Sequence, residues 1–267
     1  MKKIITILLA FSLIAVFTTG CKKEKLQNSL EKVISKNALV MGLDDSFPPM
    51  GFRNEANQIV GYDVDLAKEV ASRLGVDLVL QPIDWSAKEQ ELNTGNIDCI
   101  WNGFTMTEER QAAMSFVGPY LLNSQVVIVR NDSGITTLAD LAGKTISLQA
   151  GSSASEAVNS NSEFKSSLKK IVEFKDNLTA IMDLEARGVD AVVMDEVVAA
   201  YIIAKDNKPF VVLDEALAPE SYGIGFRKSD VELTEAVKQT LEAMAQDGTI
   251  ANISNNWFGK DISTIGK

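Results

Sequence analysis

The sequence predicts an α/β protein that is built on mainly parallel sheets and divided into two lobes. Short apolar runs, typical of strands covered on both faces, alternate with segments of helical periodicity, so the chain from Ala38 to Thr105 follows the order β, α, β, α, β. A second cycle of this kind follows, and two extended segments, near Gln125 and Tyr222, cross between the cycles. Two lobes joined in this way form a hinge with a cleft between them.

The first cycle opens with a strand at residues 38–43, which stops at a polar and aromatic exit over residues 44–49. After a hairpin-like return at residues 52–60, a helix begins at Gly61, carries an apolar stripe, and ends at Gly75, because glycine readily adopts the left-handed conformation of a C-cap. Further elements are expected at residues 76–80 (strand), 89–92 (helix) and 97–101 (strand).

The stretch from Gly95 to Tyr120 predicts a ligand site. Its strand leaves through a polar exit at residues 102–105, and ligands of open α/β sheets lie beyond the carboxyl ends of strands. Thr107 is expected to cap a helix that begins at Glu108. Arg110 lies in the first turn, where a cation opposes the helix dipole, so an anion held in its planar fork would explain it. The alternative is an exposed arginine that contributes little.

Polar residues also follow the strands of the second cycle. Ser153 and Glu156 fit a capping box that opens a helix after the exit at residues 149–153. Asp195 follows the next buried strand, and its alternative role is that of an N-cap. The expected strands are residues 144–148, 171–174, 189–193, 210–213 and 222–226, and the expected helices are residues 138–141, 177–186, 197–204 and 233–247, before a last segment ending at Trp257-Phe258.

The N-terminus resembles a bacterial lipoprotein signal. Lys2 and Lys3 precede an uncharged apolar run that is too short to span a bilayer comfortably, and Gly20-Cys21 follows. We expect a signal peptide over residues 1–20, diacylglycerol and palmitate on Cys21, and a tether over residues 21–36. Thr18 stands where such signals usually carry leucine, so an ordinary signal peptide cut elsewhere is the alternative.

Composition argues against several functional classes. The chain has 36 acidic and 26 basic residues, whereas nucleic acid requires clustered Lys and Arg. It has no histidine and two cysteines, and with Cys21 lipidated Cys99 has no disulfide partner. Metal binding and cysteine catalysis therefore have few residues to use, so we expect no metal, no cofactor and no enzymatic activity.

Three motifs together resemble the bacterial extracellular solute-binding proteins of family 3, the polar amino acid receptors of ABC importers. They are Gly61-Tyr62-Asp63-Val64-Asp65-Leu66-Ala67, the stretch Asp98–Arg110 with Phe116 and Pro119-Tyr120 beyond it, and Gly188–Asp195. The resemblance covers the chain from about Leu39 to Phe258. It implies a type II periplasmic-binding-protein fold, with one lobe at residues 37–124 and 223–267 and the other at residues 125–222.

The resemblance also implies how a ligand carboxylate is held. Arg110 matches the arginine that binds the α-carboxylate, and Thr105 matches a hydroxyl that assists it. Gly103 matches a position that contributes through its backbone. Ser152 and Ser153 match donors from the second lobe to the same carboxylate.

Other positions match contacts to the rest of an amino acid. Asp195 matches the acid that receives the α-ammonium, while Asp44, Phe47 and Trp85 match residues lining the side-chain pocket. Asn102 stands where relatives often have serine. Because a zwitterion is costly to remove from water unless each charge meets its opposite, a clamp with one charge on each lobe favours the closed state.

We therefore expect a monomeric, lipid-anchored receptor outside the cytoplasmic membrane, which delivers a free polar amino acid to the permease and ATPase of an importer. Basic or neutral polar ligands, including glutamine and cystine, are favoured over acidic ones, because no motif position offers a cation beyond Arg110, while Asp44 and Asp45 are acidic. The alternatives are an enzyme of the same fold such as a dehydratase, a ligand-sensing domain, and a peptide receptor.

Overall fold

The computed structural model describes residues 28–267, apart from the side chain of residue 206. The predicted signal peptide, Cys21 and the beginning of the predicted tether lie outside the described residues. No helix within residues 28–267 is long and apolar enough to cross a bilayer. The described part of the tether contains helix α1 (Ser29–Ser35), which is capped by Asn28 and buries Val33, so the packed body begins before residue 37.

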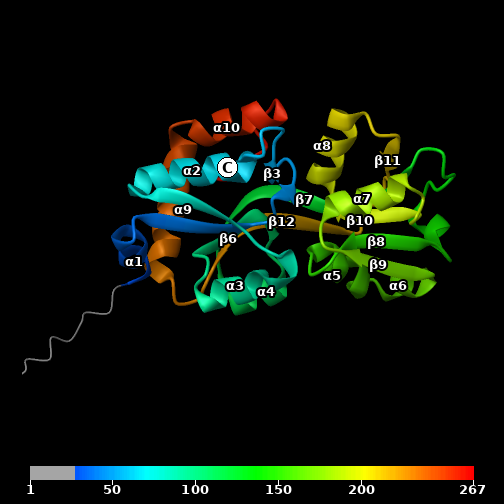
Figure 1. Ribbon diagram of the computed structural model, residues 1–267, viewed down its shortest axis with the longest axis horizontal. Coiled ribbons are helices and arrows are strands. Elements are labelled where there is room, and N and C mark those ends of the chain that lie inside the picture. The colour runs from blue at the N-terminus through cyan, green and yellow to red at the C-terminus, as the bar shows by residue number, and fades with distance from the viewer. Residues whose placement is uncertain (1–27) are drawn as a thin grey trace, which may run out of the picture.

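Two α/β lobes lie side by side and are joined by two long strands, β7 (Ser115–Arg130) and β12 (Ala218–Phe226) (Figure 1). All but three short strands belong to one sheet of order β5-β1-β6-β12-β7-β10-β8-β9, with β11 (Phe210–Val212) beside β7. The predicted lobe boundaries, 124/125 and 222/223, fall inside β7 and β12, and they stay a prediction.

The first lobe contains the parallel strands β5 (Asp77–Pro82), β1 (Ala38–Leu43) and β6 (Cys99–Thr105). In Figure 1, helices α2 (Tyr62–Leu74) and α10 (Thr249–Phe258) lie on one side of these strands, and α3 (Lys88–Thr94) and α4 (Glu108–Ala113) lie on the other. Helix α9 (Val231–Gln246) shares one hydrophobic core with α2, α10 and β1. A separate small sheet comprises β2 (Ser46–Phe47), β3 (Gly51–Arg53) and β4 (Ile59–Val60), and a 3-10 turn, η1 (Trp85–Ala87), precedes α3.

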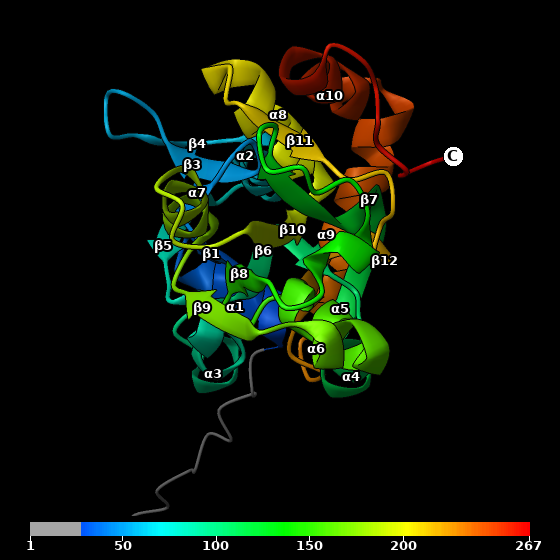
Figure 2. The ribbon, with the colours of Figure 1, turned by 90° about the vertical axis from the view of Figure 1, so that its right-hand side faces the viewer.

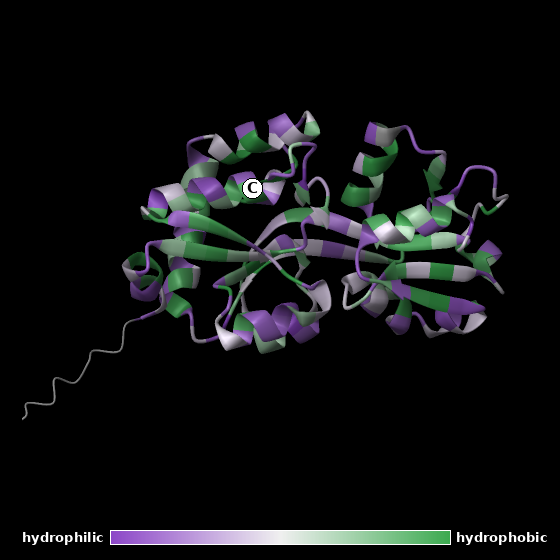
Figure 3. Cartoon of the chain, viewed as in Figure 1, coloured by the Kyte–Doolittle hydropathy of each residue, from purple (hydrophilic) through white to green (hydrophobic). Residues whose placement is uncertain are grey.

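The second lobe has the parallel strands β8 (Thr145–Gln149), β9 (Lys170–Phe174) and β10 (Ala191–Asp195). Helices α7 (Asn177–Glu185) and α8 (Glu196–Asp206) lie on the opposite side of the strands from α5 (Ser153–Ser160) and α6 (Ser162–Ser167) (Figures 1 and 2), and the 3-10 turn η2 (Leu138–Leu141) precedes β8. Figure 3 shows hydrophobic residues concentrated in the strands and alternating with hydrophilic residues along the helices.

The hinge strand β7 is continuous through both lobes. It pairs with β12 from Ser115 to Gln125, and with β10 from Gln125 to Val129. The sequence predicts a strand only from Gln125 onward, because the apolar run begins there. The earlier part of β7 is paired on one side with β12, and this pairing makes it a strand despite its mixed polarity.

Local signals otherwise agree closely with the structure. Gly75 has a φ of 71° and ends α2, and the Thr107 side chain accepts a hydrogen bond from the Arg110 backbone at the start of α4, both as predicted. Two predictions are wrong. Strand β6 continues through the polar exit at residues 102–105, and Ser153 is not the cap of α5, since Ser152 occupies the cap position without a side-chain capping bond.

The carboxylate of Asp63, in the first turn of α2, is fully buried and fixes two strands. Its Oδ2 accepts hydrogen bonds from the backbone N–H of Gly103 in β6 (2.7 Å) and from the hydroxyl of Tyr120 in β7 (2.9 Å). Burial raises the pKa of Asp63 to about 7. Because the folded protein then holds this proton more tightly than the unfolded chain does, the stabilisation is complete below about pH 4 and is lost as pH rises through about 7.

We predict that Asp63→Ala lowers the free energy of unfolding by about 2–5 kcal/mol, because two buried donors lose their acceptor. Asp63→Asn keeps an acceptor for them, so it should cost less and should flatten the fall in stability between pH 4 and pH 7. Urea unfolding at both pH values measures these effects. Equal stability of the Ala variant and the unchanged protein would show that the two bonds contribute nothing.

Candidate ligand-binding site

The carboxyl ends of β1, β6, β8 and β10 meet between the lobes. β1 leads into Asp44, β6 ends at Thr105, β8 leads into the loop before Ser153, and β10 ends at Asp195. One narrow cavity lies there, lined by Asp44, Phe47, Trp85, Asn102, Gly103, Thr105, Arg110, Gln149, Ser152, Ser153 and Asp195. These are all ten residues predicted from the sequence, together with Gln149.

Side chains of the two lobes touch across the cavity, which leaves about 10 Å³ of free space, room for about one water molecule. The hydroxyls of Thr105 and Ser153 are 3.1 Å apart, and Gln149 Nε2 donates to Asp44 Oδ2 at 2.7 Å. Gln149 is the last residue of β8, and this position at a strand end could have identified it as a site residue in the sequence. Its neutral side chain did not distinguish it from other residues of the polar exit.

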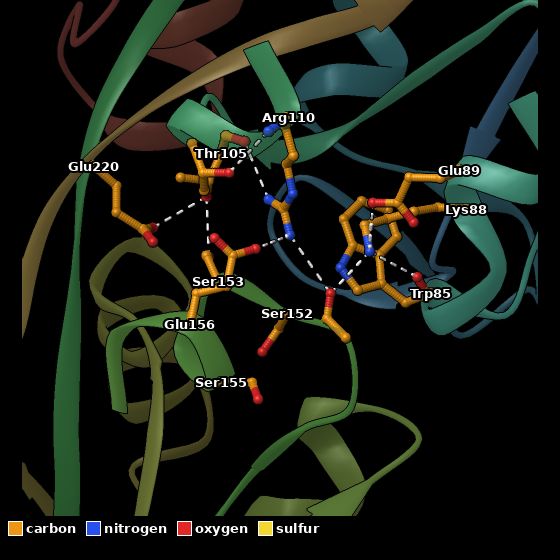
Figure 4. Close-up of polar contacts among 12 residues, drawn as sticks. Trp85, Lys88, Glu89, Thr105, Arg110, Ser152, Ser153, Ser155, Glu156 and Glu220 are labelled. Carbon is orange, nitrogen blue, oxygen red and sulfur yellow. Dashed lines mark hydrogen bonds and ion pairs between the residues drawn. The ribbon is translucent and has the colours of Figure 1, made fainter. Parts of the chain in front are cut away.

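The guanidinium of Arg110 is buried and not surface-exposed, which contradicts the alternative considered from the sequence. It donates to the carbonyl of Thr105 at 3.1 Å and lies 4.7 Å from the ring centre of Phe104. Its Nη2 lies 3.1 Å from Glu156 Oε1 and 3.5 Å from the Gly151 carbonyl, both in the second lobe (Figure 4). Glu156 therefore pairs with Arg110 instead of forming the predicted capping box.

The carboxylate of Asp195 is buried at the opposite side of the cavity. Although Asp195 stands at the cap position of α8, its side chain makes no capping bond, which contradicts the N-cap alternative. Its Oδ1 accepts hydrogen bonds from Asn123 Nδ2 and from the hydroxyl of Tyr222, both at 2.7 Å. Burial, followed by the negative charge of Glu220, raises the pKa of Asp195 well above the usual range.

Glu220, in β12, is a neighbouring acid that sequence reasoning missed. Its Oε2 accepts from Thr105 Oγ1 at 3.1 Å, and from Asn123 Nδ2 and Gln125 Nε2 at 3.0 Å each. The predicted strand began at Tyr222. Extending it by two residues would have placed Glu220 on the same face as that tyrosine, since side chains alternate along a strand.

Asp44 lies at the side-chain end of the cavity. Its carboxylate accepts from Gln149 and from the backbone of Ser46, yet burial outweighs these bonds and raises the pKa of Asp44 to about 6. Asn102 Oδ1 accepts from the Asp44 backbone at 3.0 Å, while Asn102 Nδ2 has no partner among the described residues. The Asp44 carboxylate of the first lobe and the Gln149 side chain of the second lobe therefore meet at this end of the cavity.

Polar groups of Gly103 and Ser152, two of the predicted ligand contacts, are already hydrogen-bonded within the protein. The N–H of Gly103 donates to Asp63, so it is already engaged. Gly103 has a φ of 56°, and a Cβ there would lie 2.7 Å from the Phe47 ring, so the close approach requires glycine. The Ser152 hydroxyl donates to the Gln149 carbonyl at 2.7 Å.

Lys88 is a second buried cation near the site, whereas the sequence analysis found none beyond Arg110. Its ammonium donates to the carbonyls of Trp85 (3.1 Å) and Gly151 (2.8 Å) and pairs with Glu89 at 3.1 Å (Figure 4). Burial lowers its pKa. Lys88 does not line the cavity but bridges the lobes behind Trp85. The sequence could have shown that Lys88 is buried, because it precedes the core residue Leu92 by four positions and therefore lies on the same face of the helix.

An open groove of about 1150 Å³ adjoins the cavity and shares Thr105 and Ser153 with it. Its walls come from the start of α4, from α5 and from the hinge strands, and they include Glu108, Glu156 and Glu220. Within residues 28–267, no group of three or more His, Cys, Asp or Glu side chains is placed to hold a metal ion.

Comparison with known proteins agrees with this architecture. The model of the bacterial extracellular solute-binding proteins, family 3, matches residues 39–260. The L-cystine-binding protein TcyJ of Escherichia coli K12 is 29% identical over 236 residues, which cover 88% of this chain and 87% of that protein. 

Two solved structures are also similar. An ABC uptake transporter substrate-binding protein from Streptococcus pneumoniae with bound histidine has a TM-score of 0.86 and 34% identity, covering 89% of this chain and 98% of its own. Tv2483 bound to L-arginine has a TM-score of 0.84 and 37% identity, covering 90% and 98%. The chain therefore belongs to the bacterial extracellular solute-binding proteins of family 3 and has their two-lobed type II periplasmic-binding-protein fold.

Proposed function

We propose that this protein binds a free polar amino acid between its lobes and performs no chemistry on it. The observation that carries the proposal is the pair of opposite charges at one cavity: Arg110 comes from the first lobe and Asp195 from the second, and both are buried. A guanidinium fork suits an α-carboxylate, and a carboxylate suits an α-ammonium. The relatives named above are amino acid-binding proteins, which supports the same conclusion.

Binding would exchange contacts between the lobes for contacts to the ligand. The hydroxyl contact between Thr105 and Ser153 and the bond from Gln149 to Asp44 cross the cavity, and an amino acid entering it would take over their donors and acceptors. Glu156 would give up part of the Arg110 guanidinium to the ligand carboxylate. Since each lobe satisfies only one charge of the zwitterion, the ligand favours the closed arrangement.

The ligand side chain is proposed to be basic or neutral polar. It would meet Asp44, Gln149 and Asn102, beside the rings of Phe47 and Trp85. An acidic side chain would face the Asp44 carboxylate, while Lys88 is turned toward the Gly151 carbonyl behind Trp85. The names of the similar proteins include cystine, histidine and arginine as ligands, all of which fit this class.

We also propose the cellular setting. A signal peptide over residues 1–20 and a lipid with palmitate on Cys21 would anchor a monomeric receptor outside the membrane, where it delivers its ligand to the permease and ATPase of an ABC importer. The lobes are taken as residues 37–124 with 223–267, and residues 125–222. An enzymatic role is not proposed, because the similar proteins named above are described as binding proteins.

We predict that Arg110→Ala weakens amino acid binding by about 100-fold or more, because the ligand carboxylate would be buried without its partner. Arg110→Lys keeps the charge but loses the fork, so an intermediate loss is expected. Calorimetry against the free amino acids and cystine measures both. Arg187→Ala, which removes an exposed arginine paired with Asp132, is the control. Undiminished binding by the Ala variant would refute the proposed clamp.

A second prediction concerns the side-chain end. Asp44→Asn should weaken arginine binding by about tenfold or more while changing glutamine binding only slightly, because only a cationic side chain depends on the charge. In the unchanged protein, the preference for arginine over glutamine should decline as pH falls through about 6, where Asp44 becomes protonated. Competition binding at pH 5 and pH 8 tests both statements. If Asp44→Asn prefers arginine over glutamine as strongly as the unchanged protein does, Asp44 does not contact the ligand side chain.

A third prediction concerns closure. Lys88→Met should keep the fold, because methionine suits a buried site, yet it removes a charged hydrogen bond between the lobes. We expect about tenfold or greater loss of affinity, since such bonds contribute about 1.5–3 kcal/mol. Calorimetry measures the loss of affinity. The radius of gyration of the ligand-bound protein, from small-angle X-ray scattering, reports whether the lobes still close. Lys238→Met, on the exposed face of α9, is the control. Equal affinity and radius would show that Lys88 has no part in closure.

A further inference from the structure

Two carboxylates lie near the position proposed for the ligand ammonium: Asp195 lines the cavity, and Glu220 lines the adjoining groove. Asn123 Nδ2 donates both to Asp195 Oδ1 (2.7 Å) and to Glu220 Oε2 (3.0 Å), so a single amide nitrogen separates the two acids. Asp195 belongs to the second lobe and Glu220 to the hinge strand β12. Burial, and next to it the negative charge of Glu220, raises the pKa of Asp195, so Asp195 retains its proton to a higher pH than an isolated acid.

A third acceptor lies beside them. Gln125, fully buried in β7, donates through Nε2 to Glu220 Oε2 (3.0 Å) and to Ser153 Oγ (3.2 Å). Its Oε1 has no hydrogen-bond partner among the described residues. A buried carbonyl oxygen without a donor is costly, and a primary ammonium carries three N–H groups that can serve two carboxylates and this oxygen.

We propose that Glu220 is a specificity-determining residue, which with Asp195 forms a two-carboxylate subsite that takes up a primary ammonium in exchange for a proton. The inference rests on the proposed amino acid binding and adds the subsite to it. Before binding, an O–H bond of Asp195 holds the proton. On binding, that bond breaks, the proton passes to water, and both carboxylates are then ionised beside the ammonium.

The surroundings permit this exchange. Glu220 also lines the open groove, which offers the released proton a path to solvent. Tyr222 donates its hydroxyl to Asp195, and burial raises the pKa of Tyr222 well above the usual range, so the phenol stays neutral. Asn123, Gln125 and Thr105 are uncharged.

The other charged groups are few. Arg110 lines the cavity and is paired with Glu156, while Asp44 lies at the side-chain end; Glu108 and Glu163 line the groove. Among the described residues lining the cavity and the groove, Arg110 is the single cation. Within this described lining, no lysine or arginine other than Arg110 is therefore placed to neutralise the two acids before an ammonium arrives.

The test is calorimetry of the full mature protein with L-arginine or L-glutamine, whichever binds more tightly, in phosphate and in Tris at several pH values. Because the two buffers differ in ionisation enthalpy, the difference in heat reports the protons released. We expect the unchanged protein to release close to one proton per ligand near pH 7 and none at high pH. Glu220→Gln should release far less near pH 7 and bind at least tenfold more weakly.

Two further variants separate this role from a structural one. Glu220→Asp retains a carboxylate and should restore proton release, whereas Glu196→Gln, which removes the exposed acid next to Asp195, should behave like the unchanged protein. If Glu220→Gln does not fold, proton release near pH 7 by Asp44→Asn, in which the Asp44 carboxyl can no longer contribute, still decides. Tight binding without proton release, or equal release by a folded Gln variant, overturns the inference. Failure of the unchanged protein to bind any amino acid overturns instead the proposed function.

Discussion

The buried carboxylate of Asp63 fixes β6 against the hinge strand β7, and the cavity-lining residues of the first lobe depend on that position. It holds the backbone of Gly103 and the hydroxyl of Tyr120 at once. Thr105 lies two residues after Gly103, and its carbonyl in turn accepts from Arg110. One buried acid therefore determines where the strand end, the helix behind it and the guanidinium lie relative to the hinge.

Under the proposed function, the charges around the cavity would couple closure to binding. Arg110 is already held by Glu156 across the lobes, and Lys88 bridges to the Gly151 carbonyl. A ligand carboxylate would compete with contacts of this kind, while Asp195 and Glu220 have no cationic partner among the described residues lining the cavity and the groove. The free energy of closing would then depend on how well a zwitterion replaces the contacts that the lobes make with each other.

Several side chains had two plausible roles that only tertiary contacts could separate. Ser153 and Glu156 match a capping box by spacing, yet Glu156 faces Arg110 and Ser153 faces Thr105. Asp195 occupies a cap position without capping. In each case the local bond is worth about 1 kcal/mol, and it is outweighed by partners from the other lobe for Ser153 and Glu156, and by partners on the hinge strands for Asp195.

The sequence by itself determined the fold class, most strand and helix positions, and ten of the eleven residues that line the cavity, because apolar periodicity, helix caps and family motifs are local features of the chain. Tertiary structure alone decided the contacts of Glu220, Gln125 and Lys88. Glu220 lies nearly a hundred residues from Asn123 and Gln125, and 115 residues from Thr105. Only the pairing of β12 with β6 and β7 brings these groups together, because no local pattern relates residues that are so far apart in the chain.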